Sequence, residues 1–107
     1  MQDQMASGFP RDPAIADVVD AVVRLLKPMH IYLYNQKMNL RGEVTSFKLC
    51  IVGDFADREH AERAVYLEVD SDIPFDVLVY TTSEWRRLCE QTDSFARKIS
   101  LTGTVVY

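Results

Sequence analysis

The sequence predicts one small α/β domain built on a mixed β-sheet. The chain has 107 residues, which suits a single domain. It is 48% hydrophobic and 26% charged, as folded globular proteins are. Its apolar residues recur at helical spacing in some segments and form short β-branched and aromatic runs in others. Taken in order, these segments predict the succession α-β-β-α-β-α-α-β.

The first helix is predicted to follow a polar, loosely ordered tail at residues 1–11, so that residues 12–107 form the domain. Asp12 is a favourable N-cap, and Pro13 suits the first helical position. Apolar side chains then recur at helical spacing up to Leu26. Pro28 ends the helix.

Three strands are predicted in the middle of the chain, at residues 30–34, 47–52 and 75–80. The polar run 35–44 is expected to connect the first two as a loop or hairpin. A helix capped by Asp57 separates the second strand from the third. Because these two strands are nearly all apolar, we expect them to be parallel neighbours covered on at least one face.

The C-terminal part is predicted to contain two more helices and a last strand. Thr81 and Glu84 have the spacing of a capping box, which opens a helix. A short helix at residues 94–101 follows, and residues 105–107 can add a strand. The predicted architecture is therefore an α/β sandwich with a small mixed sheet.

The composition excludes several classes of function. The net charge is −4 with no cluster of basic residues, which argues against nucleic-acid binding by charge. The longest uninterrupted apolar stretches are about four residues, too short to span a membrane. No secretory signal is recognisable, and Cys50 and Cys89 fall in elements predicted to be packed. We therefore expect a cytoplasmic protein.

Three segments resemble a known family. They are Arg41-Gly42-Glu43 in the first connection, DVLVYT at residues 76–81, and TGTVVY at residues 102–107. In this order they resemble the minimal nucleotidyltransferase domain, of polymerase-β type, over residues 19–107. The resemblance implies a small bacterial or archaeal protein with a nucleotidyltransferase-like fold. It also implies that Arg41 and Glu43 are candidates for cofactor binding.

The positions that carry the family's chemistry are altered. Asn35 and Gln36 stand where the family has Gly-Ser, and Ser46 and Lys48 stand where it has two metal-binding aspartates. Asp76 matches the third carboxylate. Transfer with two metal ions needs clustered carboxylates, and Lys48 repels a cation. We therefore expect a vestigial cleft at these five positions, with no catalytic residue, no metal and no cofactor.

Lys48 and Asp76 are expected to lie close together if their strands are parallel neighbours. The ammonium group would then replace the missing metal and form an ion pair with the carboxylate. The alternative is that Lys48 extends into solvent.

The leading functional hypothesis is a catalytically inactive nucleotidyltransferase-like domain that acts as a binding or protein-interaction module. The resemblance implies a helical partner of toxin–antitoxin type, or a homo-oligomer. One alternative is an active transferase that uses Mg²⁺ and a nucleoside triphosphate with unusual ligands drawn from Asp76, Glu43, Asp70 and Asp72. However, Asp70 and Asp72 lie in a short acidic run that is typical of a solvated turn. Another alternative is a sensor of a nucleotide or other small ligand.

Overall fold

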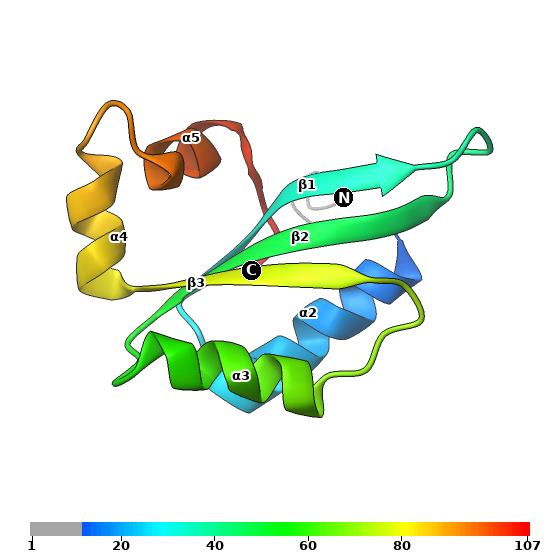
Figure 1. Ribbon diagram of the computed structural model, residues 1–107, viewed down its shortest axis with the longest axis horizontal. Coiled ribbons are helices and arrows are strands. Elements are labelled where there is room, and N and C mark those ends of the chain that lie inside the picture. The colour runs from blue at the N-terminus through cyan, green and yellow to red at the C-terminus, as the bar shows by residue number, and fades with distance from the viewer. Residues whose placement is uncertain (1–11) are drawn as a thin grey trace, which may run out of the picture.

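The computed structural model describes residues 12–107, so the tail predicted at residues 1–11 lies outside it. The described chain forms four helices and a mixed sheet of four strands in the order β3-β2-β1-β4 (Figure 1). The predicted α/β class and order of elements are confirmed. The helices are α2 (Pro13–Leu26), α3 (Arg58–Glu68), α4 (Thr82–Cys89) and α5 (Phe95–Thr102), and the strands are β1 (His30–Met38), β2 (Val44–Gly53), β3 (Phe75–Thr81) and β4 (Thr104–Val105).

The sheet is centred on a long hairpin. Strands β1 and β2 are antiparallel, and β2 and β3 are parallel neighbours joined through α3, as predicted. Strand β4 pairs with β1 on its other side, at Tyr32 and Leu33. Residues 35–38 were expected in the loop or hairpin connection but continue β1, because they pair with the first half of β2.

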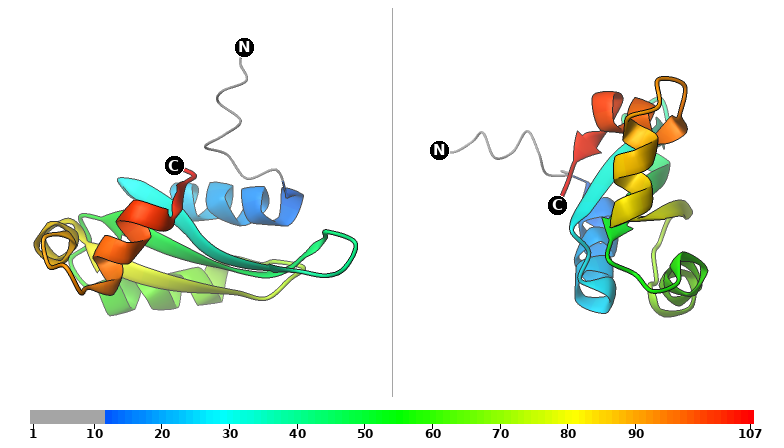
Figure 2. Two further views of the ribbon diagram at one scale, coloured as in Figure 1. Left: turned by 90° about the horizontal axis from the view of Figure 1, so that it is seen from above. Right: turned by 90° about the vertical axis from the view of Figure 1, so that its left-hand side faces the viewer.

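The first face of the sheet carries the larger core. Strand side chains that include Ile31, Leu49, Ile51 and Val79 pack there with α2 and α3, and all four are at most 3% exposed. Figure 2 shows α2 and α3 on the side of the sheet opposite α5. Removing this apolar surface from water is the main force that stabilises the fold.

The second face of the sheet is covered over only part of its length. Tyr32, Cys50, Val52 and Tyr80 pack there with α4 and α5. Figure 1 shows these two helices at one end of the sheet, whereas the tip of the β1–β2 hairpin projects at the other end. No helix of the described residues therefore covers the middle and the hairpin end of the second face.

The helices begin where the sequence predicts. Asp12 accepts hydrogen bonds from the backbone N–H groups of residues 14 and 15, and Asp57 caps α3 in the same way. Ser94 caps α5. Each cap satisfies N–H groups that the first turn of a helix leaves without partners. None of the helices in the described residues combines the length and apolar character needed to cross a bilayer.

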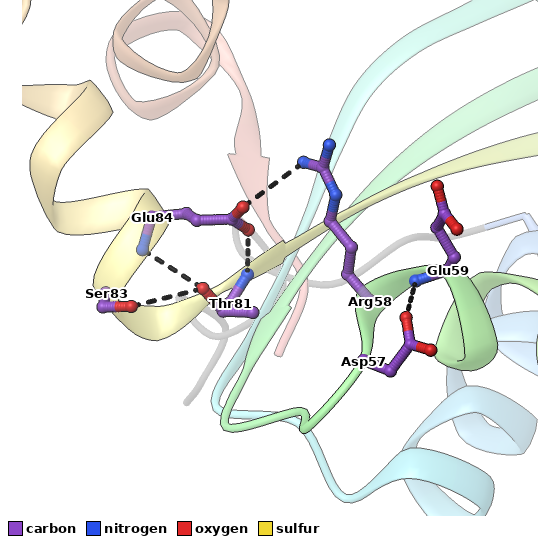
Figure 3. Close-up of polar contacts among 6 residues, drawn as sticks. All are labelled: Asp57, Arg58, Glu59, Thr81, Ser83 and Glu84. Carbon is purple, nitrogen blue, oxygen red and sulfur yellow. Dashed lines mark hydrogen bonds and ion pairs between the residues drawn. The ribbon is translucent and has the colours of Figure 1, made fainter.

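The predicted capping box joins α4 to β3 (Figure 3). The Glu84 N–H donates to Thr81 Oγ1 at 3.2 Å, and the Thr81 N–H donates to Glu84 Oε1 at 3.0 Å. Arg58, at the start of α3, lies 3.7 Å from the same carboxylate. The Thr81 N–H bond and the Arg58 charge hold the pKa of Glu84 below its usual value, although burial opposes them. The starts of α3 and α4 are thus linked at the C-terminal end of β3.

Candidate functional site

A cavity of about 470 Å³ lies between the second face of the sheet and α5. We call it the cleft. Its lining comes from strands β1, β2 and β3 and from helix α5. The lining combines two lysines, three aromatic rings and several polar groups. The lining residues are Tyr34, Asn35, Lys48, Leu78, Tyr80, Phe95, Lys98, Ile99 and Thr102.

A bulge in β1 decides which of its side chains reach the cleft. The register of β1 against β2 shifts between Leu33 and Asn35. Both Tyr34 and Asn35 consequently line the cleft, although neighbours in a regular strand face opposite sides. Gln36 pairs with Phe47, which packs in the first-face core, so Gln36 is turned away from the cleft. The predicted cleft position at Gln36 is therefore wrong.

The other predicted cleft positions lie together. Lys48 pairs in register with Asp76 across β2 and β3, and with Asn35 across β2 and β1. A small pocket of about 80 Å³ adjoins the cleft, and its lining includes these three residues and Ser46. These four residues are therefore neighbours on one face of the sheet.

The expected ion pair between Lys48 and Asp76 does not form. In residues 12–107, the ion pairs within 4.0 Å join Arg41 to Glu43 and Arg58 to Glu84. Tyr66 of α3 reaches the free edge of β3 beside this position. There the Tyr66 hydroxyl accepts a 3.0 Å hydrogen bond from the Val77 N–H, next to Asp76.

The Asp76 carboxylate is one of the groups that affect the pKa of Tyr66. Burial raises the pKa of the Tyr66 phenol most, the Val77 N–H bond lowers it, and the Asp76 carboxylate raises it again. Asp76 therefore faces a neutral hydroxyl at the sheet edge. The ammonium group of Lys48 is left beside the cleft without a carboxylate partner within ion-pair distance in the described residues.

Aromatic side chains form one wall of the cleft. The rings of Tyr34 and Phe95 meet edge to face, with centroids 5.5 Å apart and an interplanar angle of 86°. Burial is the main cause that raises the pKa of Tyr34 to about 12, with smaller contributions from Cys50 and Asp76. Both this phenol and that of Tyr80, whose pKa burial also raises, are neutral at physiological pH. They can donate hydrogen bonds.

Helix α5 supplies cleft residues that were not predicted from the sequence. Phe95, Lys98 and Thr102 follow the spacing i, i+3, i+7, so they share the helix face that lies over the sheet. This spacing was the available signal. The spacing marks cleft residues only because α5 folds back over Tyr34. Local sequence does not specify this arrangement.

Arg41 and Glu43 lie far from the cleft, at the tip of the β1–β2 hairpin. They pair with each other at 4.0 Å and are largely exposed. Asn39 organises the turn, since its side chain accepts from the N–H groups of residues 41 and 43 and donates to the Glu43 carboxylate. Gly42 adopts a φ of 81°, which glycine tolerates best. Neither charged residue lines the cleft, so the motif forms a turn here.

Asp70 and Asp72 are also separate from the cleft. They line a pocket of about 210 Å³ beside α2, together with Asp17. In the described part of the chain, no group of three or more His, Cys, Asp or Glu side chains is placed to hold a metal ion. The unusual ligand set of the active alternative, Asp76 with Glu43, Asp70 and Asp72, is consequently not brought together.

Comparisons of this chain with protein-family models, with curated proteins and with solved structures found no match. By its fold and the lining of its cleft, the chain is an α/β domain with a lysine-bearing cleft on its sheet.

Proposed function

We propose that this chain is a nucleotidyltransferase-like domain without transfer activity, and that it acts as a binding module. One observation carries the proposal. Lys48, at the position where the family has a metal-binding aspartate, lies in register with Asp76, at the position of the third carboxylate. A cation thus stands beside the one carboxylate of the site.

The chemistry of the site supports this proposal. Ser46 offers a neutral hydroxyl, Lys48 a positive charge and Asp76 a single carboxylate around the small pocket. Mg²⁺ takes hard anionic oxygens, and a two-metal site needs several of them within about 4 Å. A lysine among the ligands raises the electrostatic cost of placing a divalent ion there. Asn35 also adds a side chain where glycine would let phosphates approach the backbone.

The form of the site favours a small ligand as the bound species. Small-molecule sites are concave, and the cleft combines apolar walls with a few polar groups in this way. A protein partner or a second copy of the chain, which the family resemblance suggests, would use convex apolar surface instead. Leu67 of α3 is 74% exposed, and exposed apolar side chains of this kind support a partner as the second candidate.

The experiment that tests this proposal is a label-transfer assay. Purified protein is incubated with α-labelled ATP and Mg²⁺ or Mn²⁺, with lysate as a source of acceptors. We expect no label on the protein or on any acceptor above the level given by an Asp76→Asn variant. Transfer that depends on the metal ion and on Asp76 would overturn the proposal. A control without protein measures label bound non-specifically.

A further inference from the structure

We propose that the cleft binds a small phosphate monoester of a planar ring, and that it does so without a metal ion. This inference rests on the proposed function, because it assigns a ligand to the site from which metal-dependent transfer is absent. Three features of the cleft support it: two lysines, an aromatic wall and a volume that suits a small molecule.

Two lysines give the cleft its charge. Lys48 reaches it from β2 and Lys98 from α5, so they approach from different elements. No carboxylate lines the cleft itself, and within residues 12–107 neither lysine has an ion-pair partner within 4.0 Å. A phosphate monoester carries about 1.5 to 2 negative charges near pH 7 and therefore matches two ammonium groups.

Aromatic and apolar side chains provide a place for a flat ring. Tyr34 and Phe95 meet edge to face at the cleft, and Leu78 and Ile99 add aliphatic surface. An aromatic ring stacks favourably on such a wall, and a large share of its surface is removed from water. The amide of Asn35 offers both a donor and an acceptor to polar atoms of the ligand.

The size of the cleft sets the size of the ligand. Its volume of about 470 Å³ falls within the range of about 300–1,000 Å³ that is usual for small-molecule sites. A ring with one phosphate fits this space. Lys48 supplies the positive charge directly, so the ligand's phosphate needs no bridging cation.

The test is a titration followed by NMR, with EDTA present throughout. The probes are AMP, 1-naphthyl phosphate, adenosine and inorganic phosphate. We expect the two ring phosphates to shift the amide signals of Lys48, Phe95 and Lys98, and we expect adenosine and inorganic phosphate alone to bind at least about tenfold more weakly. AMP binding tighter than 1-naphthyl phosphate would identify a nucleotide as the preferred source, and the reverse would identify another aromatic phosphate.

Lysine variants connect the binding to the cleft. Lys48→Met and Lys98→Met keep most of the aliphatic stem, and each is expected to weaken binding of the preferred probe by about tenfold. Arg24→Met removes the same charge from α2, which packs on the opposite face, and should leave affinity unchanged. Amide signals of the lysine variants that match the native spectrum outside the cleft show that they are folded.

Two results would overturn this inference. One is the absence of binding in EDTA while the label-transfer assay stays negative; in that case the proposed function stands and the ligand assignment fails. The other is binding that both lysine variants retain. A positive transfer assay overturns the proposed function separately, whatever the titration in EDTA gives.

Discussion

Lys48 and Asp76 occupy matched positions on the parallel strands β2 and β3, yet their charges form no ion pair. Both residues line the small pocket beside the cleft. The carboxylate is next to the Tyr66 hydroxyl, and the ammonium group borders the cleft. The site therefore presents a positive charge where a metal-dependent transferase needs a negative one.

The absence of this ion pair can be tested by a double-mutant cycle. The free energy of unfolding is measured in urea for the native chain, for Lys48→Met, for Asp76→Asn and for the double variant. We expect a coupling energy below about 0.5 kcal/mol, because separated and partly exposed charges interact weakly. A coupling above about 1 kcal/mol would mean that the two groups pair in solution.

The capping box of α4 predicts a pH dependence of stability. The folded-state pKa of Glu84 is lowered, first by the Thr81 N–H bond and then by Arg58. The Glu84 charge therefore contributes stability above its unfolded pKa of about 4.3, and this contribution is lost as the pH falls through the lower folded value. We expect Glu84→Gln to lower the melting temperature at pH 7 and to have a much smaller effect near pH 3. A Glu90→Gln variant controls for net charge, and an effect of Glu84→Gln that is equal at both pH values would contradict this account.

Gly103 is required by a close backbone contact. A Cβ atom at this position would lie 2.8 Å from the carbonyl oxygen of Ile99, which already accepts the Gly103 N–H at 2.7 Å. Gly103→Ala must therefore displace the end of α5, and we expect it to cost about 1–3 kcal/mol in urea unfolding. Gly42→Asn, at the hairpin turn, keeps a residue that tolerates positive φ and is expected to cost less. The explanation fails if Gly103→Ala is as stable as the native chain.

The two cysteines should differ in reactivity. Cys50 is fully buried on the second face, and burial raises its pKa to about 12, whereas Cys89 is half-buried. Since the thiolate is the reactive form, iodoacetamide at pH 8 should modify Cys89 first and Cys50 only after unfolding. Mass spectrometry of the native chain and of the Cys89→Ser variant measures which cysteine is modified. Rapid modification of folded Cys89→Ser would show that Cys50 is accessible.

Local signals in the sequence were sufficient for the helix starts. Asp12 and the pair Thr81 and Glu84 cap helices through contacts within three residues, so their spacing alone identifies them. The parallel pairing of β2 and β3 was also predictable, because both predicted strands are nearly all apolar. This pairing is what brought Lys48 and Asp76 together.

Features that depend on distant segments could not be read from the sequence. The bulge that brings both Tyr34 and Asn35 to the cleft arises from the register of β1 on β2. Lys98 reaches the cleft only because α5 returns over the sheet. The side chain beside Asp76 is Tyr66, ten residues earlier and on α3, which no local pattern indicates. The strands and caps were therefore predictable, but most of the residues that line the cleft were not.

A Mn²⁺ titration of the native chain and of the Ser46→Asp/Lys48→Asp double variant tests whether Lys48 keeps a metal ion out of the site. The two substitutions place three carboxylates around the small pocket, counting Asp76. We expect the double variant to bind Mn²⁺ at least about tenfold more tightly than the native chain, with paramagnetic broadening of the Asp76 amide signal. Mn²⁺ binding by the native chain that broadens the same signal with equal affinity would contradict the account.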